Sequence, residues 1–345
     1  MLKSRLVLIL LPLIVLVVLA QSVFWIPTYD TLGARNPGRL QSFVETSIGD
    51  ARLLNPIFVA DTASARIADL VFDGLLRVDD HLQLQGALAT RWKVLERAFV
   101  VLADRADANV AAQALQRHLS EQDPHLLSGP IVIHPPRSAQ QSVDIARGKG
   151  PETVKIAFPQ RLELPLSRVE PHLAQLIAGA GMTGLSVDVR RERIDAGDIV
   201  LSDEHVNRLL PNVEHNPEII FWLREDARFH DRHPFDADDV VFTYQMIMDA
   251  ANRSPHRASF EPVKSVTSVS KHVLRVVYKR LFSPAVNIWK IGILPEHLLN
   301  AAALSREASA AKLTGASHLA FGLRESQFNR HPIGTGSFQF RRWSS

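Results

Sequence analysis

The residues with the greatest capacity for chemistry lie close together between His230 and Asp239. His230, Asp231 and His233 bring two imidazoles and a carboxylate into one short stretch, and these groups are common zinc ligands. Their spacing matches no pair of ligands on one helical turn, and Arg232 would place a positive charge beside the ion. The stretch therefore favours a structural turn over a metal centre, and we expect no metal or cofactor.

Two further patterns could be taken for catalytic or phosphate-binding motifs, but their surroundings argue against both. Asp238 and Asp239 are adjacent carboxylates, yet they follow a good N-cap residue, Asp236, where a helix N-terminus favours negative charge. Gly334-Thr335-Gly336 lacks the third glycine and the following helix of a dinucleotide cradle. The sequence contains no Gly-x-Ser-x-Gly, His-Glu-x-x-His or P-loop pattern. We therefore expect no enzymatic activity.

The elements that position these residues are a strand, a turn and a helix. Ile219 to Leu223 is a continuous apolar run, which is typical of a strand buried on both faces. The polar residues 224–231 end the strand, and Pro234 prevents a helix from crossing the turn. A helix follows from Asp236, with Asp239 as its capping-box partner. Its apolar residues recur at helical spacing: Val240, Tyr244, Ile247 and Ala251.

This order of residues resembles the signature of the family 5 extracellular solute-binding proteins, the peptide-binding and nickel-binding receptors of ABC importers. The positions that match the family pattern at its fixed spacing are Phe221, Leu223, Arg224, Phe229, His230, Asp231, Pro234, Ala237, Asp239, Val240 and Thr243. One position departs from the pattern, because Arg232 replaces the usual turn glycine. If that turn requires a positive φ, the replacement costs about 1 kcal/mol.

Other segments resemble the same family: Leu54-Asn55-Pro56, Phe72 to Leu75, Ala87 to Trp92, Ile293 to Leu298 and Pro332 to Phe340. In the family, the loop after the first of these segments reaches the ligand cleft. The resemblance therefore implies ligand contacts by Ala60, Asp61 and Thr62, chiefly through backbone groups. The alternative is that Asp61 or Thr62 only caps the helix that follows. Phe260 falls near where some relatives contact a ligand side chain, and core packing is its alternative role.

The resemblance implies an α/β fold of the periplasmic-binding-protein type II kind, of which this chain holds the first lobe only. Residues 43–92 and 218–345 would form that lobe, and the second lobe is missing from the sequence. Within the lobe, the residue pattern predicts a strand at 43–48, a helix at 62–76 and a strand at 273–279.

Residues 93–217 interrupt the resemblance and are expected to form an inserted α+β domain. Their periodicity predicts, in order, a strand, a helix, two strands, a helix and a strand, at 99–102, 109–119, 131–134, 154–158, 169–178 and 185–189. This is the order of elements in a ferredoxin-like unit. The stretches 135–150 and 194–217 are expected to be surface loops.

The N-terminal residues 1–26 indicate export. Lys3 and Arg5 precede an apolar run over residues 6–26, close to the ~20 residues that cross a bilayer. Val18-Leu19-Ala20 offers the small residues of a signal-peptidase site, so a cleaved signal peptide and an uncleaved inner-membrane anchor both remain open. The basic start predicts that the rest of the chain lies in the periplasm. Residues 27–42, with several Pro and Gly, are expected to be a linker.

Composition excludes several classes of function. The 345 residues include 39 Lys and Arg against 36 Asp and Glu, and no basic stripe alternates with aromatic residues, so nucleic acid is not an expected partner. Cysteine is absent, which excludes disulfides, thiolate metal sites, a cysteine nucleophile and a lipid-modified N-terminal cysteine.

The resemblance implies a periplasmic receptor that encloses an oligopeptide between two lobes and delivers it, chemically unchanged, to the permease of an ABC importer. One alternative is a membrane-anchored sensor or scaffold in which the inserted domain binds a partner protein. Another is a truncated remnant that binds nothing, because a single lobe offers a ligand only half of its contact area.

Overall fold

The computed structural model describes residues 14–19, 21, 49–104, 106–143, 152–178, 180 and 187–343. The chain divides into two units, residues 1–50 and 51–345. In the first unit residues 14–19 are helical and exposed, and no helix among the described residues is long and apolar enough to span a membrane. The linker 27–42, the strand predicted at 43–48 and most of the predicted signal or anchor lie outside the described residues.

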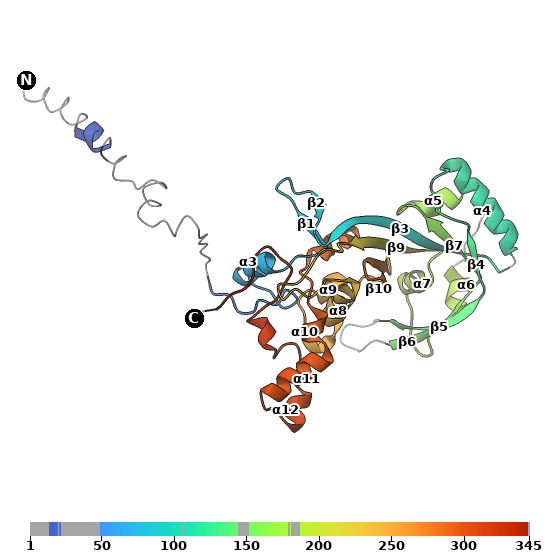
Figure 1. Cartoon of the computed structure of the whole chain (residues 1–345). Helices are drawn as coiled ribbons and strands as arrows, with labels where there is room; N and C mark the ends of the chain where they lie inside the picture. Colours follow the sequence, from blue (N-terminus) through green and yellow to red (C-terminus); the bar gives the residue numbers. More distant parts are fainter. Residues whose placement is uncertain are drawn as a thin grey trace, which may run out of the picture. The chain divides into compact units, whose positions relative to one another are not determined.

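The second unit is organised around an antiparallel sheet of six strands in the order β10-β11-β9-β3-β7-β4 (Figure 1). Two long strands, β3 (Ala89–Val101) and β9 (Val213–Leu223), pair along almost their whole length at its centre. The other strands are β10 (Val263–Ser270), β11 (Val273–Tyr278), β7 (Arg161–Leu166) and β4 (Val132–His134). The strand predicted at 273–279 is therefore confirmed as β11.

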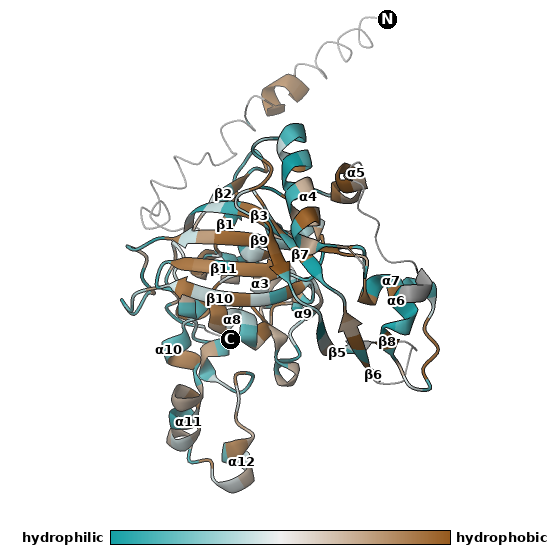
Figure 2. Ribbon diagram, turned by 90° about the vertical axis from the view of Figure 1, so that its right-hand side faces the viewer, coloured by the Kyte–Doolittle hydropathy of each residue, from teal (hydrophilic) through white to brown (hydrophobic). Residues whose placement is uncertain are grey.

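Strand β9 is longer than its apolar run predicts, because its first half has one polar face. Ile219, Phe221 and Leu223 face the core, whereas Glu214 and Glu218 lie on the opposite face and form ion pairs there. The Nη1 atom of Arg161 is 3.1 Å from Glu214, and the Nε atom of Arg97 is 3.2 Å from Glu218. Such ion pairs between strands stabilise charged residues in the sheet. A pattern of apolar residues does not identify these charged residues as part of a strand. Figure 2 shows the apolar residues concentrated on β3, β9 and β11.

Helix α8 (Ala237–Met248) begins where the sequence predicts. The Asp236 carboxylate accepts the N–H of Asp238 at 2.9 Å, and the Asp239 carboxylate accepts the N–H of Asp236 at 3.0 Å. The predicted capping box is therefore confirmed. The remaining elements after α8 are η2 (Ala250–Asn252), α9 (Arg257–Phe260), η3 (Ser283–Ala285), η4 (Asn287–Lys290), α10 (Glu296–Leu299), α11 (Ala301–Ala310), α12 (Gly315–Leu319) and η5 (Gln327–Asn329).

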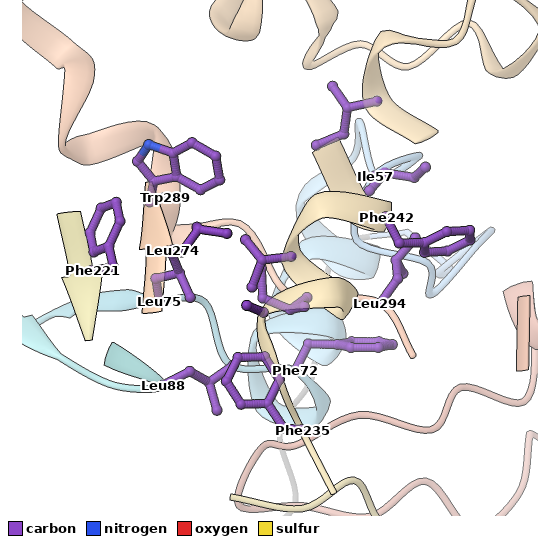
Figure 3. Packing of buried hydrophobic residues seen from close by; sticks show 14 of the residues in the cluster. Ile57, Phe72, Leu75, Leu88, Phe221, Phe235, Phe242, Leu274, Trp289 and Leu294 are labelled. Carbon is purple, nitrogen blue, oxygen red and sulfur yellow. The ribbon is translucent and has the colours of Figure 1, made fainter. Parts of the chain in front are cut away.

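The chain segments before and after residues 93–217 share one hydrophobic core (Figure 3). Helix α3 (Thr62–Val71) and the hairpin β1 (Leu76–Val78) and β2 (Leu84–Gly86) supply one side, and β9, β11 and α8 supply the other. The side chains that meet include Ile57, Phe72, Leu75, Leu88, Phe221, Phe235, Leu274, Trp289 and Leu294. Helix α3 ends at Val71 rather than at residue 76, because Phe72 turns to an extended conformation and carries its ring into this core.

Residues 93–217 continue the same sheet, and both predicted boundaries fall inside strands β3 and β9. Strand β3, α4 (Ala108–Gln122), β4, β7, α5 (Leu173–Ala178) and β9 follow one another along the chain, and in space the strands lie in the order β9-β3-β7-β4. These are two interleaved βαβ units, which is the ferredoxin-like arrangement predicted from the order of elements. Two of its strands differ from the prediction. Its third strand is β7, because the predicted strand 154–158 belongs to β6 (Glu152–Phe158) of a separate sheet, and its last strand is β9 and not residues 185–189.

Several predicted elements in this region are wrong. Residues 187–189 belong to helix α6 (Val187–Glu192), and helix α5 starts only at Leu173, after Pro171. The predicted loops contain β5 (Arg137–Val143), β8 (Ile194–Asp195) and α7 (Asp203–Leu209). Strand β5 has no apolar alternation, and it is a strand because it pairs with β6 (Glu152–Phe158) in a three-stranded sheet of order β5-β6-β8.

A buried charged residue lies on β3 between residues of two separate cores. Val94 packs against the first core, while Ala98 belongs to a second core under α4 and α5. Between them Glu96 is 1% exposed, and its carboxylate accepts the N–H of Glu170 at 2.8 Å and contacts Nδ1 of His215. Because a buried carboxylate must be paired, Glu96 fixes the segment around Glu170 and strand β9 relative to β3.

Candidate functional site

The start of helix α3 holds three of the four residues predicted to contact a ligand. Asp61 is the N-cap, and its carboxylate accepts the N–H of Ser64 at 2.8 Å. This hydrogen bond holds the pKa of Asp61 below its ordinary value. Ala60 and Thr62 are exposed on either side of the cap. Asp61 therefore caps helix α3, which was the alternative to its predicted ligand contact. Ala60 and Thr62 are accessible to a ligand.

Phe260, the fourth predicted contact, is a core residue. It is 2% exposed, and its ring packs edge-on against Trp289 with 5.4 Å between ring centroids and against Tyr244 at 6.3 Å. Phe260 nevertheless forms part of the wall of a cavity next to α3, so it lies close to solvent-accessible space on one side.

This cavity, called here the α3 cavity, has a volume of about 620 Å³. That volume lies within the ~300–1,000 Å³ typical of ligand pockets. Its apolar wall includes Val59, Ala65, Phe72, Phe260, Ile288 and Ile291. Val59 and Ala65 flank residues 60–62 in the chain, so the structure brings Phe260 and the start of α3 to one cavity, although Ala60, Asp61 and Thr62 are not in its wall.

The α3 cavity also contains charged groups of both signs. Partial burial raises the pKa values of Asp69 and Asp73, and for Asp73 the positive charges of Arg77 and Arg224 oppose the rise. Burial lowers the pKa of His256. Arg77 and Lys290 supply positive charge in the same wall. A cavity with carboxylates and cations among apolar side chains suits a ligand that carries both charges.

Both ring nitrogens of His230, in the turn between β9 and α8, contact backbone groups of the segment around Gly334. Its Nε2 atom is 2.8 Å from the carbonyl oxygen of Gly336, and its Nδ1 atom accepts the N–H of Gly334 at 3.3 Å. Both contacts are satisfied by one neutral tautomer, with the proton on Nε2. Neither nitrogen is available to a metal, which supports the predicted structural turn.

Asp231 and His233 meet a third residue, His297 of α10. The Nε2 atom of His297 is 2.7 Å from the Asp231 carboxylate, and the rings of His233 and His297 stack at 3.7 Å between centroids. Burial raises the pKa of Asp231, but hydrogen bonds from His297 and from the N–H of His233 outweigh it and leave the pKa below its ordinary value. These contacts join the turn to α10.

Asp239 and Thr243 attach helix α8 to the chain that leads into α10. The Asp239 carboxylate accepts the N–H of Glu296 at 2.9 Å, and the Thr243 hydroxyl accepts the N–H of Leu294 at 2.9 Å. Burial raises the pKa of Asp239 to about 7, against the opposing effect of its two N–H donors. The neighbouring Asp238 is exposed whereas Asp239 is buried, so the two adjacent carboxylates lie in different environments.

Among the described residues, the only group of His and acidic side chains close enough to share a metal ion is Asp79, Asp80 and His81. These residues form the exposed turn between β1 and β2. The Asp79 carboxylate already accepts the backbone N–H groups of His81 and Gln83 and the side-chain amide of Gln85. The hairpin turn accounts for this cluster.

The sequence pattern did not predict a second cleft, called here the β5 cleft. It has a volume of about 630 Å³ and lies between β5, α7 and the β10–β11 edge of the large sheet. Its wall includes the cations Arg137, Arg208, Lys264, Lys279 and Arg280. No basic run marks this cleft in the sequence, because its cations come from separate elements that only the fold brings together.

Residues 213–345 match the sequence model of the bacterial extracellular solute-binding proteins, family 5. The predicted resemblance to this family is therefore confirmed over those residues. The oligopeptide-binding protein AppA of Bacillus subtilis is 28% identical over 126 residues, which cover 35% of this chain and 20% of AppA.

Two solved structures are also similar to this chain. AppA from Bacillus subtilis, in complex with a nonapeptide, has a TM-score of 0.42 at 17% identity, covering 86% of this chain and 33% of AppA. NikZ from Campylobacter jejuni, in complex with Ni(L-His), has a TM-score of 0.41 at 17% identity, covering 86% of this chain and 32% of NikZ. The chain thus spans about one fifth of the curated relative and about one third of these solved proteins.

Proposed function

We propose that this chain forms part of the solute-binding component of an ABC importer and binds its ligand without chemical change. The match of residues 213–345 to the family 5 solute-binding proteins supports this proposal, and so does the name of the Bacillus subtilis relative, an oligopeptide-binding protein. An oligopeptide is the ligand that we propose, and the permease of the importer is the partner.

The observation that carries the proposal is the shared core of the two chain segments on either side of residues 93–217. Leu75 and Phe72 from the first segment pack with Phe221 and Trp289 from the second. Had these segments formed separate bodies, the family-like motifs would have lacked a common framework. Instead, the motif residues of both segments pack into one hydrophobic core.

We place the ligand contacts at the α3 cavity and at the exposed residues beside it, Ala60 and Thr62. A peptide carries an ammonium and a carboxylate group, which the carboxylates of Asp69 and Asp73 and the cations of Arg77 and Lys290 complement. Peptide side chains would pack on the apolar wall around Phe260. Peptide backbone groups would hydrogen-bond to the main chain at residues 60–62.

A peptide-capture experiment on the full chain tests this proposal. The purified protein is mixed with a pool of oligopeptides of varied sequence, and the complexes are identified by native mass spectrometry. We expect oligopeptides to be retained in preference to free amino acids of the same composition. Cooperative unfolding of the purified chain would show that it is folded. A folded chain that retains no peptide would contradict the proposal.

A matched pair of variants tests the position of the site. Ala65→Trp fills the α3 cavity from helix α3, whereas Ile67→Trp adds the same side chain on the same helix at an exposed position outside the cavity wall. We expect peptide affinity to fall about tenfold or more in the first variant, because the pocket that buries the ligand is lost. The second variant should bind as the unaltered protein does. Equal affinities in both variants would remove the site from this cavity.

We further propose that the chain is exported to the periplasm, with residues 6–26 acting either as an inner-membrane anchor or as a cleaved signal peptide. The apolar run and the basic residues before it support this proposal. Fractionation of expressing cells tests it: an anchored chain stays with the membranes after osmotic shock, whereas a chain cleaved after Ala20 is released.

A further inference from the structure

The β5 cleft lies outside the α3 cavity and carries an excess of positive charge. Five cationic side chains contribute to its wall, whereas Glu214 is the single carboxylate there. Glu214 is already shared by Arg161, at 3.1 Å, and by Lys264, at 3.8 Å. Lys279 and Arg280 both pair with Glu261, at 3.2 Å and 3.4 Å. The available carboxylates are thus fewer than the cations.

Two arginines of the cleft have no anionic partner among the described residues. Arg137 lies on β5 with its guanidinium 5.2 Å from the centroid of the Phe158 ring, and it forms no ion pair there. Arg208, in the last turn of α7, forms no hydrogen bond or ion pair with any described side chain. Guanidinium groups bind carboxylates in a bidentate manner, so two unpaired arginines in one cleft are potential anion ligands.

A buried arginine next to the cleft, Arg161, uses the single carboxylate of its wall. Arg161 is 5% exposed and lies over the ring of Phe158, and its Nε atom has no hydrogen-bond partner. Burial lowers the pKa of Arg161, the negative charge of Glu214 opposes this decrease, and the positive charge of Arg137 adds to it. An anion in the cleft would reduce this repulsion.

The cleft also meets a strand edge with unpaired backbone groups. Strand β5 is at the end of its sheet, and within the described part of the chain it pairs only with β6. Ala139, Gln140 and Gln141 are consecutive and all lie in the cleft wall. Successive side chains of a strand point to opposite faces, so three in a row indicate that the cleft runs along the edge of β5. A free edge is a template for another strand.

We propose that the β5 cleft binds an extended acidic segment of a partner protein, which adds as a strand to the free edge of β5. Its carboxylates lie against Arg137, Arg208 and Lys264. The apolar side chains that alternate with them pack on Phe158, Leu209 and Leu281. Main-chain hydrogen bonds to β5 supply a second, charge-independent part of the affinity.

The arrangement of the cations favours a peptide segment over a small anion such as phosphate. A phosphate ion is held by donors that converge on one point. Here the cations are distributed over β5, α7, β10 and the chain after β11, with apolar residues between them. An extended chain with a negative charge at every second residue fits this distribution.

The test uses the full chain and a fluorescein-labelled peptide in which Glu alternates with Val, with binding followed by fluorescence polarisation. A matched probe has Gln in place of Glu. Two further probes carry N-methyl groups on the amide nitrogens of either the Glu or the Val residues. In a strand added at an edge, only alternate N–H groups point toward the neighbouring strand. We therefore expect one methylated probe to bind about tenfold more weakly and the other to bind as the parent does.

The protein variants remove charge at exposed positions so that the fold is retained. Arg137→Gln combined with Arg208→Gln should weaken binding of the Glu probe about tenfold and leave the Gln probe unaffected. The control combines Arg117→Gln with Arg306→Gln, two exposed arginines outside the cleft, and should bind normally.

Four results would overturn the proposal. They are no binding of the Glu probe, equal binding of the Glu and Gln probes, equal effects of the two methylation patterns, and displacement of the probe by inorganic pyrophosphate at equal concentration. The last result would identify the cleft as a site for small anions. None of these results bears on peptide capture at the α3 cavity, so the two proposals can fail separately.

Discussion

Arg232 adopts a positive φ of 74° in the signature turn, at the position where the family pattern has glycine. The sequence indicated that Arg232 would be strained if this turn requires a positive φ, and in the structure it does. The left-handed conformation is unfavourable for a residue with a Cβ atom, by about 1–2 kcal/mol. The Arg232 carbonyl, and not its side chain, accepts the hydrogen bond from Arg228 in this turn, at 3.2 Å.

We expect Arg232→Gly to raise the free energy of unfolding by up to about 1 kcal/mol, because glycine relieves the strain. The greater freedom of glycine in the unfolded chain reduces the gain. Urea unfolding monitored by circular dichroism measures the change. Arg232→Ala is the control, since it removes the side chain and keeps the strain, and its stability should match that of the unaltered protein. A less stable glycine variant would show that φ strain is not the relevant cost.

Asp239 should make stability depend on pH. Its pKa rises from an ordinary 3.8 to about 7 in the folded protein. Between these values the folded state binds more protons than the unfolded chain, so the free energy of unfolding decreases as pH rises. The contribution is fully present below pH 3.8 and is lost as pH rises through about 7. It amounts to a few kcal/mol, on the order of 1.4 kcal/mol per pKa unit.

Urea unfolding at a series of pH values tests this expectation with Asp239→Asn. The variant does not titrate, so the decrease in stability between about pH 4 and pH 7 should be smaller than in the unaltered protein. It should also lose about 1 kcal/mol at all pH values, because an amide has one acceptor oxygen for the N–H groups of Asp236 and Glu296. Parallel pH profiles would show that Asp239 is ionised in the folded protein.

At the scale of elements, the segment around Gly334-Thr335-Gly336 closes the end of helix α3. The N–H of Gly336 donates to the carbonyl of Val71 at 2.8 Å, and the N–H of Phe338 donates to that of Leu70 at 3.1 Å. A Cβ atom at Gly334 would lie 2.0 Å from the Val71 oxygen. The glycines therefore permit a close backbone approach, rather than a phosphate cradle.

We expect Gly334→Ala to lower the free energy of unfolding by about 1–3 kcal/mol, because the added methyl group pushes the segment away from α3. Gly322→Ala is the matched control. Its new methyl group would meet only the Glu325 carboxylate, at an ordinary 3.5 Å. Thermal unfolding of both variants distinguishes the two sites. Equal stabilities would indicate that the segment can shift without loss of packing.

At the scale of the whole second unit, β3 and β9 are shared by the core under α8 and the ferredoxin-like unit. One end of this strand pair carries the core under α8, and the other end completes the ferredoxin-like unit with β7 and β4. Glu96 and His215 lie where the two cores meet. Because neither part can be released without breaking β3 and β9, we infer that the two parts unfold together.

Native-state amide exchange in low urea tests this inference with Leu115→Ala on α4. Leu115 is fully buried in the second core, so the variant should lose about 2–5 kcal/mol. We expect the slowest amides of α8, in the other part, to show the same loss. Val110→Ala, at a 64% exposed site of α4, is the control and should change neither part. A loss confined to α4 and α5 would mean that the parts open independently.

The sequence by itself determined the signature strand, turn and capped helix and the structural role of His230 and Asp231. In residues 93–217 it determined helix α4 and strands β4 and β6, but not the full order of elements. These features depend on neighbouring residues: Asp236 can cap α8 and Pro234 can end a strand whatever surrounds them. The residues in the signature were therefore identified correctly, including the strained Arg232.

Only the tertiary structure decided which segments become strands at polar sequences, and which distant residues share a cleft. Strand β5 and the first half of β9 are strands because partners pair with them and ion pairs satisfy their charges, and neither cause appears in local periodicity. The same holds for the α3 cavity and the β5 cleft. Their walls come from residues far apart in the chain, which only the tertiary fold brings together.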